Sequence, residues 1–175
     1  FGGNYIYAIA GDGCLMEGIS SEAASIAGHL KLGNLIYFYD DNTITIEGHT
    51  DLTFSEDVEK RFLAYGWHVV HADAYDHESI RKAIVAGQNE KEKPTLIITK
   101  SLIGCGSPNK SNTSEVHGSP LGKEELIATK QNIGWPVDKE FYVPDEVAKL
   151  FADRKVELKK KYDEWKTEYV KWKKE

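Results

Sequence analysis

The sequence is poor in the features that crosslink a chain or anchor it in a membrane. Its 175 residues include two cysteines and one methionine, and they contain no run of 18 or more apolar residues. Without such a run no segment can span a bilayer, so we expect no membrane association. Cys14 and Cys105 are too few and too far apart for a disulfide framework, which favours a reducing compartment. Residues 1–4 lack the basic stretch and apolar core of a signal peptide, and we expect a cytoplasmic protein.

An excess of basic side chains is also missing. Lysine and arginine number 22 against 28 aspartates and glutamates, which gives a net charge of −6. Nucleic-acid-binding proteins usually need a concentrated basic surface, so we expect no nucleic-acid partner. Residues 145–175 hold ten basic and eight acidic side chains, so the acidic excess lies in the rest of the chain. An acidic domain that binds an anionic ligand is expected to recruit a cation, because its own field repels the ligand.

The apolar residues form short runs that alternate with helical patterns. Four runs rich in β-branched and aromatic residues predict strands at 5–10, 35–39, 67–71 and 95–99, of which the first two are expected to be buried. Helical spacing of small and apolar residues predicts helices at 17–31, 58–65 and 78–88. This alternation is typical of a doubly wound α/β fold, in which a mostly parallel sheet carries helices on both faces.

The composition changes after the last predicted strand. Residues 101–122 are rich in Gly, Ser, Asn and Pro, and a loop this long is usually a functional lid or a disordered linker. A short helix is expected at 123–131. Beyond Pro144 one apolar stripe at helical spacing predicts a C-terminal amphipathic helix that packs on this or a neighbouring domain: Leu158, Tyr162, Trp165, Tyr169 and Trp172. We therefore expect a domain at 1–144 and a charged helical exit segment at 145–175.

Polar turns follow the first two predicted strands. Gly11-Asp12-Gly13 comes after the first, and Asp41-Asn42 comes after the second. The carboxyl ends of parallel strands meet at one edge of a sheet, where open α/β sheets bind their ligands. Glycine lets the backbone approach a phosphate closely, and carboxylate and amide oxygens suit Mg²⁺. Together the turns point to Mg²⁺ bridging to a diphosphate, although either turn by itself reads as an ordinary connection.

Longer stretches around these turns resemble the thiamine diphosphate motif in the form found in the transketolase family. The motif opens at Gly11-Asp12-Gly13, continues through Glu17-Gly18 and closes at Asp41-Asn42, where the general motif has two asparagines. The similarity extends to about Val147 and includes the stretches 56–58, 64–67, 93–96, 103–104, 106–107 and 117–121. By this resemblance the chain is identified as the diphosphate-binding N-terminal domain of that family, without its first part.

The resemblance implies a metal and cofactor site. The side chains of Asp12 and Asn42 and the main-chain carbonyl of Ile44 would bind Mg²⁺ or Ca²⁺. The cofactor-binding residues would be Gly11, Asp12, Gly13, Glu17, Asn42, Ile44, Ile46 and His117. Ile46 is equally compatible with a packing role.

The resemblance also assigns three catalytic residues. His117 would contact the cofactor diphosphate, bind substrate hydroxyls and transfer protons, as an imidazole can near neutral pH. Glu17 and Glu22 would join a hydrogen-bonded network between active sites at a dimer interface. Without the resemblance, a loop histidine is usually solvated, and acids early in a helix are favoured by its dipole.

The family's reaction transfers a two-carbon ketol unit from a ketose phosphate to an aldose phosphate in the pentose phosphate pathway. A pyrimidine-binding domain, from the same chain or from the partner in a homodimer, would complete the site, so this chain alone is expected to be inactive. Two alternatives stay open. The chain could belong to another thiamine diphosphate enzyme, such as dihydroxyacetone synthase, which a screen of acceptor substrates would distinguish. It could also be a noncatalytic cofactor-binding subunit, which the flanking gene sequence would reveal.

Overall fold

A computed structural model describes residues 3–174 of the chain. They form two compact units, of which the first ends at Trp135 and the second begins at Pro136. The two units are described one at a time.

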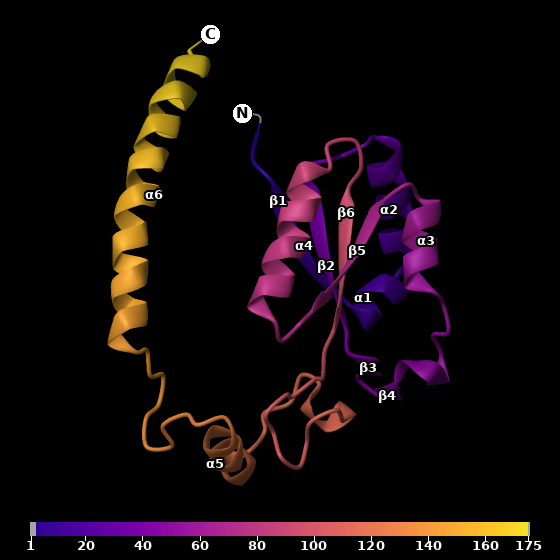
Figure 1. Cartoon of the computed structure of the whole chain (residues 1–175), viewed down its shortest axis with the longest axis vertical. Coiled ribbons are helices and arrows are strands. Elements are labelled where there is room, and N and C mark those ends of the chain that lie inside the picture. Colours follow the sequence, from indigo (N-terminus) through magenta and orange to yellow (C-terminus); the bar gives the residue numbers. More distant parts are fainter. Residues whose placement is uncertain (1–2, 175) are drawn as a thin grey trace. The chain divides into compact units, whose positions relative to one another are not determined.

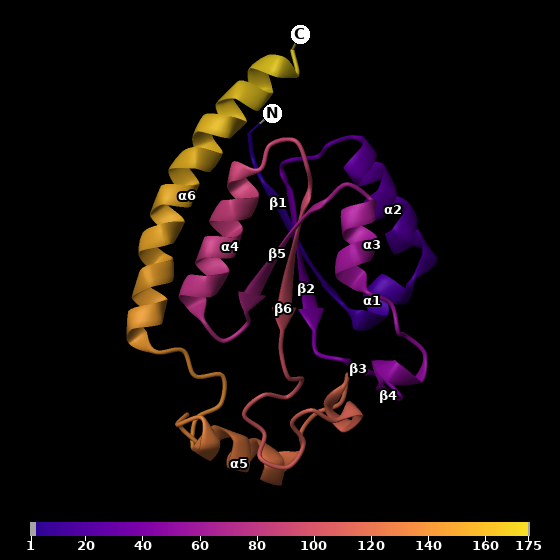
Figure 2. The ribbon, with the colours of Figure 1, turned by 45° about the vertical axis from the view of Figure 1, so that its right-hand side comes forward.

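The first unit is built on a sheet of four parallel strands. These are β1 (Ile6–Gly11), β2 (Leu35–Asp41), β5 (His68–Asp73) and β6 (Thr95–Lys100), in the order β1-β2-β6-β5. Figures 1 and 2 show α4 (His77–Asn89) on one face of the sheet, with α2 (Gly18–His29) and α3 (Val58–Ala64) on the other. The predicted doubly wound α/β fold is confirmed.

Shorter elements lie beyond the carboxyl ends of the strands. They are α1 (Asp12–Met16), the antiparallel pair β3 (Ile44–Thr45) and β4 (Gly48–His49), two 3₁₀ turns at Thr50–Leu52 and Ser114–Val116, and α5 (Lys123–Asn132). The helix predicted at 17–31 therefore begins at Gly18, and a separate short helix precedes it. The break falls at Glu17, whose backbone is extended at φ −68° and ψ 133°.

Two apolar clusters hold the helices on the sheet. On the α2 and α3 face, Trp67 packs edge-on against Phe62 with ring centroids 5.0 Å apart. The Trp67 indole N–H donates to the carbonyl of Ala24 at 2.8 Å, so this buried aromatic has its polar atom paired. On the other face, Ile36 and Ile97 from the two central strands pack with Ala83 of α4. Central strands covered on both faces explain the continuous apolar runs.

Strand β1 differs from its prediction as a buried strand. It lies at the edge of the sheet and pairs with β2, and Ile9 is 78% exposed. Helix α4 packs chiefly over β5, β6 and β2, and it reaches β1 through its Gln88 side chain, which donates to the Tyr7 hydroxyl. A continuous apolar run indicates a strand, but it does not reveal whether that strand is central or at an edge.

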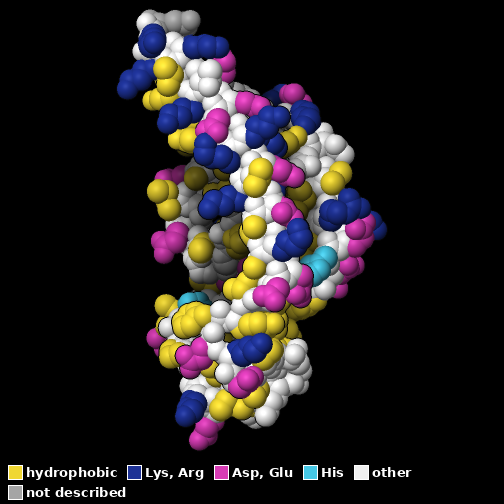
Figure 3. Space-filling model, turned by 90° about the vertical axis from the view of Figure 1, so that its left-hand side faces the viewer, with side chains coloured by type: hydrophobic (Ala, Val, Ile, Leu, Met, Phe, Trp, Pro, Cys, Tyr) yellow, Lys and Arg dark blue, Asp and Glu magenta, His cyan; other side chains and the backbone are white. Residues whose placement is uncertain are grey.

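Helix α6 (Asp145–Trp172) is the main element of the second unit and begins directly after Pro144, as predicted. Its aromatic stripe forms a row of ring contacts, with centroid distances of 5.8 Å for Tyr162–Trp165 and 5.2 Å for Trp165–Tyr169. Figure 3 shows basic and acidic side chains mixed along this helix. In the described part of the chain, no helix combines the length and the apolar character that crossing a membrane requires.

Helix α2 passes so close to the turn between α3 and β5 that position 28 has no room for a side chain. A Cβ on Gly28 would lie 1.9 Å from the backbone carbonyl oxygen of Tyr65. We predict that Gly28→Ala lowers the free energy of unfolding by about 1–3 kcal/mol, because the helix must move away from its neighbour. Urea denaturation of the whole protein measures the change.

The matched control for this prediction is Gly18→Ala, at the start of the same helix. A Cβ there meets nothing within 4 Å. Alanine is expected to leave stability unchanged or raise it by up to about 1 kcal/mol, because it reduces the entropy of the unfolded chain. Equal losses in the two variants would contradict the close-packing explanation.

Candidate functional site

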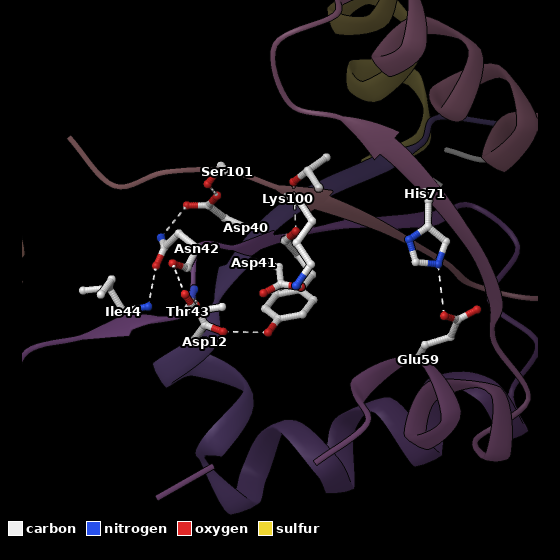
Figure 4. A network of polar contacts seen from close by, with 12 residues as sticks. Asp12, Asp40, Asp41, Asn42, Thr43, Ile44, Glu59, His71, Lys100 and Ser101 are labelled. Carbon is white, nitrogen blue, oxygen red and sulfur yellow. Dashed lines mark hydrogen bonds and ion pairs between the residues drawn. The ribbon is translucent and has the colours of Figure 1, made fainter. Parts of the chain in front are cut away.

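The candidate site lies where β1 and β2 end side by side. The parallel register pairs Gly11 at the end of β1 with Asp40 near the end of β2. The chain then enters α1 from β1 and a tight turn from β2, so Asp12 and Asn42 come to the same edge of the sheet (Figure 4). The adjacency of the two polar turns, expected from the βαβ pattern, is what the structure shows.

Asp12 is buried and has a donor at each carboxylate oxygen. It is 3% exposed, and Oδ1 accepts from the Tyr39 hydroxyl at 2.6 Å while Oδ2 accepts from the Thr43 N–H at 3.0 Å. Burial raises the pKa of the Asp12 carboxyl above its ordinary value, and the Tyr39 hydrogen bond opposes that rise. Burial and the bond to Asp12 also raise the pKa of Tyr39, so the phenol stays protonated as a donor.

Asn42 is oriented by hydrogen bonds on both sides of its amide. Its Nδ2 donates to Asp40 Oδ2 at 3.1 Å, and its Oδ1 accepts from the Ile44 N–H at 3.0 Å. Asp40 in turn accepts from the Ser101 hydroxyl, which links this turn to the segment after β6. Thr43, which lies between Asn42 and Ile44, has φ +61°, a left-handed conformation that is rare for a β-branched residue. Backbone strain of this kind concentrates at functional sites.

One cavity of about 580 Å³ brings together most of the predicted site residues. Its lining includes seven of them, namely Gly11, Asp12, Gly13, Glu17, Asn42, Ile44 and His117. It also includes Cys14, Asp40, Ile103 and Gly118, which were not predicted as site residues. Glu22, on the exposed side of α2, and Ile46, which is 69% exposed, are not part of this lining.

The cavity suits a phosphate group and a hard cation. A Cβ on Gly11 or Gly13 would meet nothing within 4 Å, so the backbone there borders open space into which an anion fits. The described residues contain no group of three or more His, Cys, Asp or Glu side chains placed to hold a metal by themselves. A cation at Asp12 and Asn42 would therefore complete its shell with ligand and water oxygens, as Mg²⁺ usually does.

His117 reaches the cavity from the long loop at 101–122. The residue is exposed, and its backbone N–H donates to the carbonyl of Ser114 at 3.0 Å. It comes from a segment more than 70 residues beyond Asn42 in the sequence, so the cavity is assembled from three separate stretches of the chain. The structure thus brings His117 to the same cavity as Asp12 and Asn42.

A second polar cavity of about 330 Å³ lies on the other side of Asp12, which lines both. Lys100 at the end of β6 forms an ion pair with Asp41 there, and His71 lies 3.1 Å from Glu59 (Figure 4). The negative charge of Asp41 is a further cause of the raised pKa of Asp12. Lys100 partly balances this charge, a role that could not be predicted from its position at the end of a strand.

Comparisons with known proteins agree on one family. The family described as "Transketolase, thiamine diphosphate binding domain" matches residues 2–175. The chain is 50% identical over 173 residues to a transketolase of Nostoc sp., in an alignment that covers 97% of this chain and 26% of that protein. It is 49% identical over 175 residues to a chloroplastic transketolase of Craterostigma plantagineum, in an alignment that covers 98% of this chain and 33% of that protein.

A solved structure with the same fold is that of the Pichia stipitis transketolase complex with sedoheptulose-7-phosphate. It superposes with a TM-score of 0.86 at 44% identity, over 92% of this chain and 24% of that one. The chain thus spans between about a quarter and a third of the length of these relatives.

The Tyr39 hydroxyl should contribute measurably to stability through Asp12. We predict that Tyr39→Phe lowers the free energy of unfolding by about 1–3 kcal/mol, because it leaves a buried carboxylate oxygen without its donor. Urea denaturation at neutral pH measures the loss. Tyr37→Phe, which removes a hydroxyl from the same strand without disturbing the Asp12 carboxylate, is the control and should change stability less. A loss no larger than that of the control would show that the Tyr39–Asp12 bond contributes little.

Proposed function

Because this chain belongs to the transketolase family and matches the thiamine diphosphate binding domain of that family, we propose that it supplies the diphosphate- and metal-binding half of a transketolase active site. The activity is transfer of a two-carbon ketol unit from a ketose phosphate to an aldose phosphate. The observation that carries the proposal is that the Gly-Asp-Gly turn, Asn42 and His117 all line one cavity.

The metal would be held by hard oxygens at the ends of β1 and β2. Asp12 and Asn42 offer side-chain oxygens, and the Ile44 main-chain carbonyl offers a third, to Mg²⁺ or Ca²⁺. Gly11 and Gly13 leave the space beside them open for the diphosphate. The bound cation then neutralises the anionic cofactor within an otherwise acidic domain.

Acid–base work falls to the chain's own side chains. Thiamine diphosphate supplies the carbon nucleophile and the electron sink of the reaction when it is bound. His117, exposed at the same cavity, binds substrate hydroxyls and gives or takes a proton there. Glu17 lines the cavity and would contact the cofactor region, while Ile46, more distant from it, would shape the surroundings.

The partner would be a second copy of the full-length protein, and a pyrimidine-binding domain from the same or the partner chain would complete the site. The exposed face of α2 supports this assignment, because Ile19 and Ile26 are 74% and 59% exposed on either side of Glu22. Apolar side chains exposed together in this way are typical of an interface. Glu22, with Glu17, would then belong to the hydrogen-bonded network between active sites, and this chain by itself would be inactive.

The compartment is proposed to be the cytoplasm, within the pentose phosphate pathway. Cys14 and Cys105 are both free and exposed, as expected for a protein kept in a reducing environment.

Removing the Asp12 carboxylate tests the metal assignment. We predict that Asp12→Ala weakens the binding of thiamine diphosphate in the presence of Mg²⁺ by more than about tenfold, because even residues that only support a metal ligand change metal affinity by this much. Isothermal titration calorimetry of the whole protein measures the affinity. Chelating the metal with EDTA should weaken cofactor binding strongly in the wild type and much less in the variant.

Asp138→Ala is the control for this experiment, because Asp138 is an exposed aspartate outside the cavity. It should leave the calorimetric affinity unchanged. An Asp12→Ala protein that bound the cofactor as tightly as the control, with the same response to EDTA, would remove Asp12 from the metal site.

A charge on the exposed face of α2 should disrupt the homodimer. We predict that Ile26→Arg shifts the whole protein from dimer to monomer in sedimentation velocity at micromolar concentration, because it places a charge in an apolar interface. Val156→Arg on α6, where the side chain is 73% exposed, is the control and should leave the dimer intact. A dimer unaffected by Ile26→Arg would move the interface to another surface.

A further inference from the structure

The loop that carries His117 is held by a buried carboxylate on α5. Glu125 is 9% exposed and accepts three hydrogen bonds from neutral donors. The hydroxyl of Ser107, itself 4% exposed, and the N–H of Asn109 donate to Oε1, and the Asn109 side-chain amide donates to Oε2; the two Asn109 bonds are both 2.9 Å long. These bonds, that of Ser107 first, lower the pKa of Glu125 to about 2, so the group is ionised at neutral pH.

Burial of this charge is not required by helix α5 itself. Glu124 and Glu125 both lie in the first turn of the helix, where an acid is favoured by the helix dipole. Glu124 is exposed and fulfils that role in solvent. A carboxylate that leaves solvent loses hydration, and only well-placed donors compensate for the loss. Glu125 therefore has a second role, which is to hold the two residues that bind it.

The turn at 107–110 is bonded to the chain beyond His117, and Gly104 lies close to the residue before it. The Lys110 N–H donates to the Ser107 hydroxyl at 3.1 Å, and the Lys110 side-chain amine reaches across to the Leu121 carbonyl at 3.3 Å. On the other side, Gly104 has φ +64°, and a Cβ there would lie 3.0 Å from Val116, the residue before His117. The loop is thus bonded after the histidine and closely packed before it.

Further bonds close the start of the loop. The Asn112 N–H donates to the Ile103 carbonyl at 2.9 Å, and the Asn132 side chain at the end of α5 donates to the Gly106 carbonyl at 2.9 Å. Ile103 and His117 line the same cavity. Residues 101–122, predicted as a lid or a disordered linker, form an ordered loop with its own polar centre.

We infer that Glu125 is a positioning residue: its carboxylate fixes the loop at 101–122 and thereby holds the His117 imidazole at the cavity lined by Asp12 and Asn42. This inference rests on the proposed function for the part that His117 takes in ketol transfer. Glu125 does not itself line the cavity, so its effect on the reaction passes through the loop.

The test combines hydrogen–deuterium exchange and kinetics on the full-length enzyme, with the pyrimidine-binding domain that completes its active site. Glu125→Gln keeps the size of the side chain but turns an amide donor toward a donor of Ser107 or Asn109. Hydrogen–deuterium exchange should become at least tenfold faster in peptides covering 107–118 and stay unchanged in β2 and β6. The kcat/KM for ketol transfer should fall about 10–100-fold in the wild-type background and less than about twofold in a His117→Ala background, because the histidine is then no longer there to be placed.

Two further variants complete the design. Glu124→Gln, one residue away and exposed, should change neither the exchange nor the kinetics. Asn109→Ala removes one bond to Glu125 and leaves the carboxylate in place. It should therefore produce a smaller increase in the exchange of the same loop peptides, and it serves as the test if Glu125→Gln fails to fold.

The inference is overturned if loop exchange is unchanged in the Glu125 and Asn109 variants. It is overturned as well if Glu125→Gln lowers kcat/KM equally with and without His117, which would indicate a general structural role. A wild-type full-length enzyme without ketol transfer, or a His117→Ala enzyme with full activity, would instead contradict the proposed function, and the exchange rates would still decide whether Glu125 fixes the loop.

Discussion

The candidate site depends on the buried carboxylate of Asp12. This residue lies where β1 passes into α1, yet its oxygens are bonded to Tyr39 on β2 and to Thr43 beyond it. A carboxylate this deeply buried is costly unless donors meet it, so the bonds hold the ends of two strands at one separation. The two cavities described at the site share this side chain as part of their walls. The position of Asp12 therefore sets the shape of the space on either side.

The rest of the site is built differently, because a loop has no sheet ladder to place it. In the loop at 101–122, the Ser107 hydroxyl, the Asn109 side-chain amide and one backbone group, the Asn109 N–H, all donate to Glu125. The two carboxylates resemble each other chemically, since each is buried and each is met by neutral donors. They differ in what they hold: Asp12 joins two strands, and Glu125 joins a helix to a loop.

Much of the fold could be predicted from the sequence, because apolar runs and helical spacing are local signals. The adjacency of the two polar turns followed from the topology of parallel strands. The supporting residues could not be predicted in this way. Tyr39 sits in an apolar run and reads as a core aromatic, Asp40 reads as the end of a strand, and Glu125 reads like its neighbour Glu124. Each acts through a partner far away in the sequence, and a single sequence does not show which distant residues come close together in space.

The edge position of β1 has a consequence for handling the protein at the bench. Its outer edge pairs with no strand of residues 3–174, and Ile6, Tyr7 and Ile9 are among the exposed apolar side chains. A long apolar strand with open backbone hydrogen-bonding groups is a template on which another strand can add. Preparations of this chain alone are therefore expected to self-associate as the concentration rises.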